Sequence, residues 1–99
     1  MSPGSYWSLR YSVEETQMKI LRFTASWCEP CKALAKNIER VETEREIQVI
    51  DIDEEQDLAQ HFMVRSVPTL IRIDQDKKEV DRIVGVQSTA QLDKFINSN

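Results

Sequence analysis

The fold of this chain is decided by one stretch, Phe23-Thr24-Ala25-Ser26-Trp27-Cys28-Glu29-Pro30-Cys31-Lys32, which contains both cysteines of the 99 residues. Apolar residues typical of a β-strand precede this stretch, and apolar residues at helical spacing follow it. Pro30 suits the first turn of a helix, where its missing N–H leaves no hydrogen bond unmade. We therefore expect both cysteines at a junction where a strand ends and a helix begins.

Two cysteines at this spacing and position are typical of a redox-active dithiol. A helix N-terminus offers unpaired N–H groups and the positive end of the helix dipole, and both favour a thiolate. We expect them to lower the pKa of Cys28, which would make Cys28 the attacking nucleophile in disulfide exchange. Cys31 falls almost one turn inside the helix on its apolar face, so we expect it to be the shielded, resolving thiol. Pro30 stiffens the ring that a disulfide between them would close.

Two other interpretations of the cysteine pair stay open at this point. The cysteines could be unrelated core residues, or they could form half of a zinc site. A zinc site needs four ligands, and His61 is the only other soft candidate, although it is more typical of a solvated helix residue. Beside the cysteines, Lys32 adds a cation and Glu29 adds an opposing anion. Whether their net effect raises or lowers the pKa of Cys28 is therefore open.

The composition is that of a soluble globular domain, with 40% hydrophobic and 30% charged residues. The net charge is −4 and there is no basic run, so we expect no binding of nucleic acid or anionic membranes. The apolar runs are too short to span a bilayer, and no leader peptide is visible, so we expect a cytoplasmic monomer. We expect a disordered terminus over residues 1–5 and a single domain over 6–99.

Hydrophobic periodicity predicts an α/β fold with a mixed central sheet. We expect strands over 6–11, 19–25, 47–52, 70–73 and 79–84, and helices over 13–18, 29–44, 54–63 and after Ser88. Ser12 with Glu15 and Ser88 with Gln91 fit capping boxes, and Asp53 fits a helix cap. Alternating strands and helices imply a parallel portion with helices on both faces, and the last two strands imply a C-terminal antiparallel hairpin.

The chain resembles the thioredoxin family from about Lys19 to its C-terminus. The resemblance is carried by Trp27-Cys28-Glu29-Pro30-Cys31-Lys32, Asp51-Ile52-Asp53, Val67-Pro68-Thr69 and Val84-Gly85. It implies a thioredoxin fold with a shortened N-terminal βα unit, and a thiol–disulfide oxidoreductase that reduces protein disulfides. A reductase or a small thiol would regenerate the dithiol. No organic cofactor and no metal are implied, only the redox-active disulfide between the two cysteines.

The resemblance also implies a substrate-binding surface. Pro68 would be a cis-proline set against the cysteines, and the backbone of Val67 and Thr69 beside it would bind an extended substrate segment. Gly85 would lie near the docking groove, where backbone approaches backbone closely. Trp27 would pack beside the cysteines and form the rim of that surface.

One departure from the family concerns the site itself. The family typically has a buried aspartate six positions before the first cysteine, and this chain has Arg22 there. A lysine common on the neighbouring strand is replaced by Val49. Arginine stays protonated and cannot act as a base. Our hypothesis is that Arg22 lowers the pKa of the thiols, that of Cys31 especially, and makes the protein more oxidising. The alternative is that Arg22 merely extends to a surface carboxylate.

Two other functions compete with a protein-disulfide reductase. A glutaredoxin-like enzyme would use glutathione, but the Trp-Cys-x-x-Cys-Lys segment favours the thioredoxin type. Alternatively, the domain could be a binding module for a larger partner protein, in which redox turnover is incidental. The missing aspartate motivates the binding module, and the presence of both cysteines favours the oxidoreductase.

Overall fold

The computed structural model describes residues 18–98, which form a four-stranded sheet and three helices. The elements are β1 (Lys19–Thr24), α2 (Glu29–Glu39), β2 (Ile47–Asp51), α3 (Gln56–His61), β3 (Thr69–Ile73), β4 (Glu79–Val84) and α4 (Thr89–Asn97). Six strands and helices with two stated ends were predicted after residue 18, and all six occur. The strand 79–84 has the predicted bounds, and the other five have altered bounds. The predicted terminus 1–5, the strand 6–11 and the helix from residue 13 with its capping box lie outside the described residues, apart from Met18.

The sheet has the order β2-β1-β3-β4 and is mixed. β1 and β2 run parallel, while β1 with β3 and β3 with β4 run antiparallel. The predicted combination of a parallel portion and a C-terminal hairpin is therefore confirmed. A parallel pair needs a crossover connection, and α2 supplies it between β1 and β2. The predicted strand ends are correct to within one residue.

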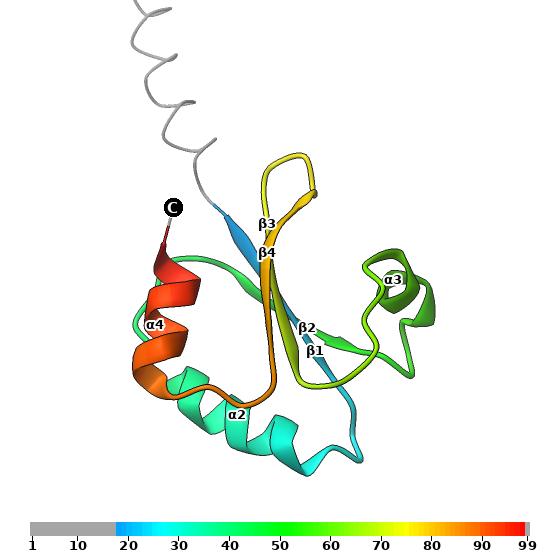
Figure 1. Cartoon of the computed structure of the whole chain (residues 1–99), viewed down its shortest axis with the longest axis horizontal. Helices are drawn as coiled ribbons and strands as arrows, with labels where there is room; N and C mark the ends of the chain where they lie inside the picture. The colour runs from blue at the N-terminus through cyan, green and yellow to red at the C-terminus, as the bar shows by residue number, and fades with distance from the viewer. Residues whose placement is uncertain (1–17, 99) are drawn as a thin grey trace, which may run out of the picture.

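Two apolar clusters lie on opposite faces of the sheet, and helices cover both (Figure 1). On one face, buried residues of β1, α2, β3 and α4 pack together: Ile20, Leu34, Leu70, Leu92, Phe95 and Ile96. On the other face, buried residues of β1, β2 and β3 meet α3 and the residue after it: Leu21, Phe23, Ile50, Ala59, Phe62, Ile71 and Ile73. The helix that carries the cysteines is thus fixed to the sheet by its apolar side.

Helix α2 is shorter than predicted, because it ends at Glu39 rather than at residue 44. Arg40 caps it, and the N–H of Val41 bonds back to the carbonyl of Ile38 over 2.9 Å as the chain turns towards β2. Val41 nevertheless packs against the core from outside the helix. Its apolar side chain continued the helical spacing in the sequence, which is why the prediction ran too far.

Helix α3 was also predicted too long, and its predicted cap is wrong. The helix spans Gln56–His61 instead of 54–63, and the residue at its N-cap is Glu55, without a side-chain bond. Asp53 does not cap it. The preceding turn is instead held by Asp51, whose carboxylate accepts the N–H of Asp53 over 2.8 Å. At the other end, Met63 has a φ of 56°, which a continuing helix does not allow.

Helix α4 begins as the sequence predicts. The Ser88 side chain accepts the N–H of Gln91, and the Gln91 side chain accepts the N–H of Ser88, so the capping box is confirmed. The preceding hairpin turns at Asp74, whose carboxylate accepts the N–H groups of Asp76 and Lys78. The capping box and the Asp74 turn both provide hydrogen-bond partners for backbone N–H groups that would otherwise have none.

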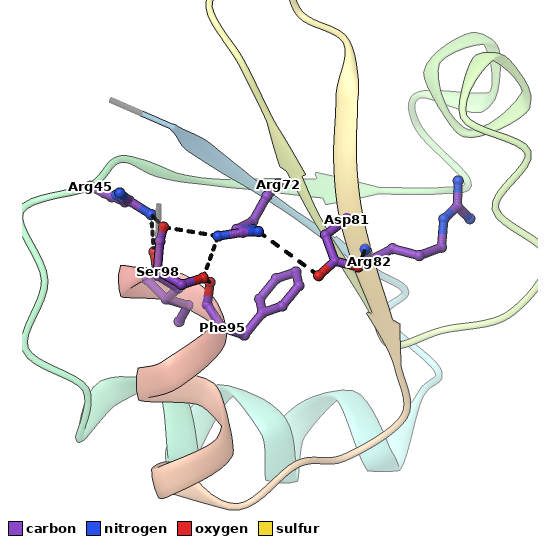
Figure 2. A network of polar contacts seen from close by, with 7 residues as sticks. Arg45, Arg72, Asp81, Arg82, Phe95 and Ser98 are labelled. Atoms are coloured by element: carbon purple, nitrogen blue, oxygen red, sulfur yellow. Dashed lines mark hydrogen bonds and ion pairs between the residues drawn. The ribbon is translucent and has the colours of Figure 1, made fainter. Parts of the chain in front are cut away.

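A buried arginine on β3 holds the end of α4 (Figure 2). Arg72 is 6% exposed and donates to the backbone carbonyl of Ser98 over 2.8 Å and to its hydroxyl. Its guanidinium lies over the Phe95 ring, 5.3 Å from the centroid, and 3.9 Å from the carboxylate of Asp81. Arg45 donates to the same Ser98 carbonyl. Arg72 therefore ties β3, β4 and α4 together at the end of the sheet away from the cysteines.

Candidate active site

The two cysteines form a disulfide at the N-terminus of α2. Their Cα atoms are 5.3 Å apart. Cys28 is the N-cap residue, and its Sγ accepts the backbone N–H of Cys31 over 3.1 Å. Pro30 lies in the first turn, as predicted. The strand–helix junction therefore presents one sulfur to the free N–H groups of the helix and anchors the other within it.

The expected difference in exposure between the cysteines is absent in this disulfide-bonded form. Cys28 is 3% exposed and Cys31 is 2% exposed. They pack with Ala25 in a small buried cluster that Val67 and Ile52 border. What distinguishes the two sulfurs is their place on the helix, one at the cap and one inside the first turn, rather than the area each shows to solvent.

The charged residues beside the cysteines pair with each other. Lys32 Nζ lies 3.0 Å from a carboxylate oxygen of Glu29, and both side chains are well exposed. An exposed pair of this kind has a weak, strongly screened field. The two residues thus largely offset one another, and neither dominates the electrostatics at Cys28.

Trp27 projects into solvent next to the disulfide. It is 65% exposed, and its indole N–H donates to a carboxylate oxygen of Asp53 over 2.9 Å. In the sequence, Asp53 fits a helix cap and a family-like segment, and it was not predicted as a site residue. Because the two residues lie 26 positions apart, local pattern could not pair them. The only feature of the sequence that could have indicated this pairing was the position of Asp53 just beyond a strand predicted to be parallel to the one before Trp27.

The Val67–Pro68 peptide bond is cis, the isomer that the resemblance implies. Val67 packs against the buried cluster of the cysteines, and Thr69 donates its hydroxyl to the Ser66 carbonyl over 2.8 Å. The Pro68 carbonyl accepts the N–H of Gly85 over 2.9 Å. The structure thus brings the segments 67–69 and 84–85 together beside the cysteines.

Gly85 is required for its backbone conformation rather than for space. Its φ is +93°, in the region that favours glycine, whereas a Cβ added there would meet no atom within 4 Å. Crowding by residues 18–98 is therefore not the reason for glycine here, and the approach of a substrate backbone at Gly85 stays a prediction. Its neighbours Val84 and Val86 are exposed, so an apolar surface continues past the glycine.

Arg22 lies on β1, with Val49 and Leu70 as its neighbours on the adjacent strands. Its side chain is half-buried, and burial lowers the pKa of the guanidinium. Arginine nevertheless keeps its charge at neutral pH. Within residues 18–98 the Arg22 side chain makes no hydrogen bond and no ion pair. It is thus a cation without a carboxylate partner in the described part of the chain.

Comparisons with known proteins agree on one family. A family model described as Thioredoxin matches residues 8–98. A thioredoxin of Chlamydia caviae is 38% identical over 87 residues, which cover 85% of this chain and 84% of that protein. A thioredoxin of Staphylococcus haemolyticus is 33% identical over 89 residues, covering 86% and 85%. The solved structure of a mutant thioredoxin from Halobacterium salinarum matches with a TM-score of 0.73 at 34% identity, covering 86% of this chain and 77% of that one.

The fold and the dithiol at a helix N-terminus define a protein that exchanges thiols and disulfides. The chain belongs to the thioredoxin family. It has the thioredoxin fold and is a thiol–disulfide oxidoreductase of the protein-disulfide reductase type. Among residues 18–98, no helix has the length and apolar character to cross a membrane.

Proposed function

We propose that Cys28 is the nucleophile and Cys31 the resolving thiol in the reduction of protein disulfides. The Cys28 thiolate attacks one sulfur of a substrate disulfide, and the other substrate sulfur leaves as a thiolate. Cys31, as thiolate, then attacks the Cys28 sulfur, and the second substrate sulfur leaves. Two electrons have passed to the substrate, and the Cys28–Cys31 disulfide remains.

One observation carries this assignment: the Cys28 sulfur accepts a helical N–H at the cap of α2. A hydrogen bond to a sulfur stabilises the charged form more than the neutral one. The helix dipole adds to this at the cap and weakens along the helix. Both effects favour Cys28 over Cys31 as the thiolate at rest, and neither requires a carboxylate base.

The substrate is held by the surface around the cysteines. We assign Trp27 and the 67–69 segment to opposite sides of an extended substrate segment, with Gly85 beyond Pro68. Val67 contacts the cysteine cluster and Trp27 is exposed next to it, which supports this arrangement. No metal or organic cofactor takes part. A reductase or small thiol restores the dithiol, and the protein acts as a monomer in the cytoplasm.

Insulin reduction with dithiothreitol as electron source tests the assignment. Wild-type protein accelerates precipitation of the insulin B chain, and Cys28→Ser abolishes the acceleration. A normal circular dichroism spectrum of the variant shows that the fold is intact. Equal acceleration by both proteins would exclude Cys28 as the nucleophile.

The binding-module alternative makes a different prediction in cells. If redox turnover were incidental, a Cys28→Ser, Cys31→Ser double variant would complement a thioredoxin-dependent process as well as wild type does. We expect no complementation. Full complementation would leave the dithiol without a role and favour the binding module.

A further inference from the structure

We propose that the Arg22 guanidinium stabilises the thiolate of the reduced site, so that the Cys28–Cys31 disulfide is easier to reduce than with a neutral residue at position 22. The inference rests on the dithiol function proposed above. It concerns the equilibrium between disulfide and dithiol, not the identity of the nucleophile. Two observations carry it: the half-buried side chain of Arg22, and its lack of a carboxylate partner within residues 18–98. A third support is the position of Arg22 beneath α2, which we infer from the alternation of β1.

The alternation of β1 places Arg22 under the helix that holds the cysteines. Ile20, on the same face of the strand, shares a buried cluster with Leu34 of α2. A helix that connects two parallel strands runs back along the first one. The step from Ile20 to Arg22, about 6.7 Å, and the step from Leu34 to Cys31, about 4.5 Å, therefore run in the same direction. This puts Arg22 below the turn of α2 that contains Cys31.

The neighbouring strands determine where the guanidinium can go. Leu70, beside Arg22 on β3, is 1% exposed, so the sheet face is closed on that side. Val49, beside it on β2, is 52% exposed, so the face is open towards β2. The charge thus sits half-buried at the margin of α2. A partly buried charge is screened much less than one in open solvent.

Nearby carboxylates do not neutralise it. Asp51 lies on the same face two residues beyond Val49, but the structure shows no ion pair between it and Arg22. One oxygen of Asp51 instead accepts N–H groups of the turn after β2. On α2, Glu29 is paired with Lys32. The field of Arg22 at the cysteines is therefore not cancelled by an ion pair in the described residues.

A cation here acts on one side of the redox equilibrium. When dithiothreitol reduces the site, its two thiols supply two electrons and close to a cyclic disulfide. The Cys28–Cys31 bond breaks and each sulfur gains one electron. Each sulfur then either takes up a proton and becomes a thiol, or remains a thiolate while the proton passes to the buffer. A neutral disulfide gains little from a nearby cation, whereas a thiolate gains much. The reduced form is the one stabilised.

The test is the equilibrium constant of the couple in dithiothreitol buffers for wild type, Arg22→Leu and Arg22→Lys. We expect Arg22→Leu to disfavour the reduced form about tenfold, or about 30 mV for two electrons. The pKa of the Cys thiolate, followed by its ultraviolet absorbance, rises by about one unit in the same variant. Arg22→Lys keeps the charge and stays close to wild type.

Arg40→Gln is the matched control, because it removes an arginine from the other end of α2 and leaves the equilibrium constant unchanged. Equal constants for wild type and Arg22→Leu would overturn the proposal. So would a Lys variant that behaves like the Leu variant, since the charge would then not be the cause. A failure of the proposed dithiol function is distinguishable from a failure of this proposal. In the first case wild type would not reduce insulin, whatever the equilibrium constants of the variants.

Discussion

The indole N–H of Trp27 and the carboxylate of Asp53 are joined over 2.9 Å, across a sequence separation of 26 residues. This bond ties the loop before the cysteines to the turn after β2. These two segments follow neighbouring parallel strands, so they meet at the same edge of the sheet. The orientation of the exposed indole thus depends on a residue from another part of the chain.

Asp53→Ala should therefore lower insulin reduction several-fold with little loss of stability. An exposed hydrogen bond contributes about 1 kcal/mol or less, but without it the indole is free to leave its place beside Cys28. Fluorescence of Trp27, measured in a Trp7→Phe background, reports the change directly. Glu54→Ala removes a neighbouring exposed charge and should leave activity intact. An equal loss in both variants would mean that charge, not the hydrogen bond, matters.

The order of attack predicts which cysteine can be trapped on a substrate. Cys31→Ser keeps the nucleophile but removes the resolving thiol, so it accumulates a mixed disulfide between Cys28 and the substrate. Cys28→Ser accumulates none, or far less. Non-reducing electrophoresis followed by mass spectrometry of the linked peptide measures this. Linkage through Cys31 in the Cys28→Ser protein at comparable yield would contradict the assigned roles.

Arg72 offers a test of how much a buried charge stabilises this fold. Within residues 18–98 its Nε is buried without a hydrogen-bond partner, and its acidic neighbour Asp81 stays accessible to water. Arg72→Met keeps much of the volume and removes the buried charge, so we expect a change within about 1 kcal/mol. Arg72→Ala leaves a cavity and should cost about 2–4 kcal/mol.

Urea unfolding of the two Arg72 variants separates packing from polar contacts. If Arg72→Met proves as costly as Arg72→Ala, the bonds to Ser98 and the contact with Phe95 carry the stability. If the Met variant is as stable as wild type, the packing of the aliphatic part of the Arg72 side chain accounts for its contribution to stability. The first result would contradict the prediction.

Acid should weaken one contact within β4, the ion pair between Glu79 and Arg82. Arg82 donates two hydrogen bonds to Glu79, each of 2.6 Å, and they hold the pKa of Glu79 below its ordinary value. A carboxyl whose pKa is lower when folded stabilises the protein above its unfolded pKa, about 4.3. That contribution disappears as the pH falls through the folded value.

The free energy of unfolding should therefore differ between wild type and Glu79→Gln at pH 7, and the difference should shrink below about pH 4. Urea denaturation at several pH values measures it. A difference that stays constant down to pH 3 would show that ionisation of Glu79 does not contribute. Asp93→Asn provides an exposed acidic residue as the comparison.

Strands were predicted more accurately than helix ends, for a physical reason. The strands contain runs such as Leu70 and Ile71 that bury on both faces, and their limits are marked by polar turns. The helix signal at residues 29–44 overran because Val41 reaches the core from a loop. Periodicity reports which side chains are buried, and it does not report which backbone hydrogen bonds are made.

At the site, the local features were predictable and the long-range ones were not. Cys28 at a cap, Cys31 inside the first turn and Pro30 between them follow from neighbouring residues. The partner of Trp27 does not, because Asp53 had a plausible local use as a helix cap. The same holds for Arg72, whose partners come from β4 and α4. Polar partners brought together by the fold leave no periodic trace in the sequence.

The position of β3 in the sheet has a consequence for motion. All five of its residues are buried, and it is bonded to β1 and β4 on its two sides. In the described sheet β2 is at the edge and has one neighbour. We expect amide hydrogens of β3 to exchange only when the whole domain unfolds, and those of β2 to exchange through local opening. Opening at β2 would release Asp53, and with it the indole, while the sulfur atoms keep their geometry. The rim could then adapt to partners of different shape around an invariant reacting centre.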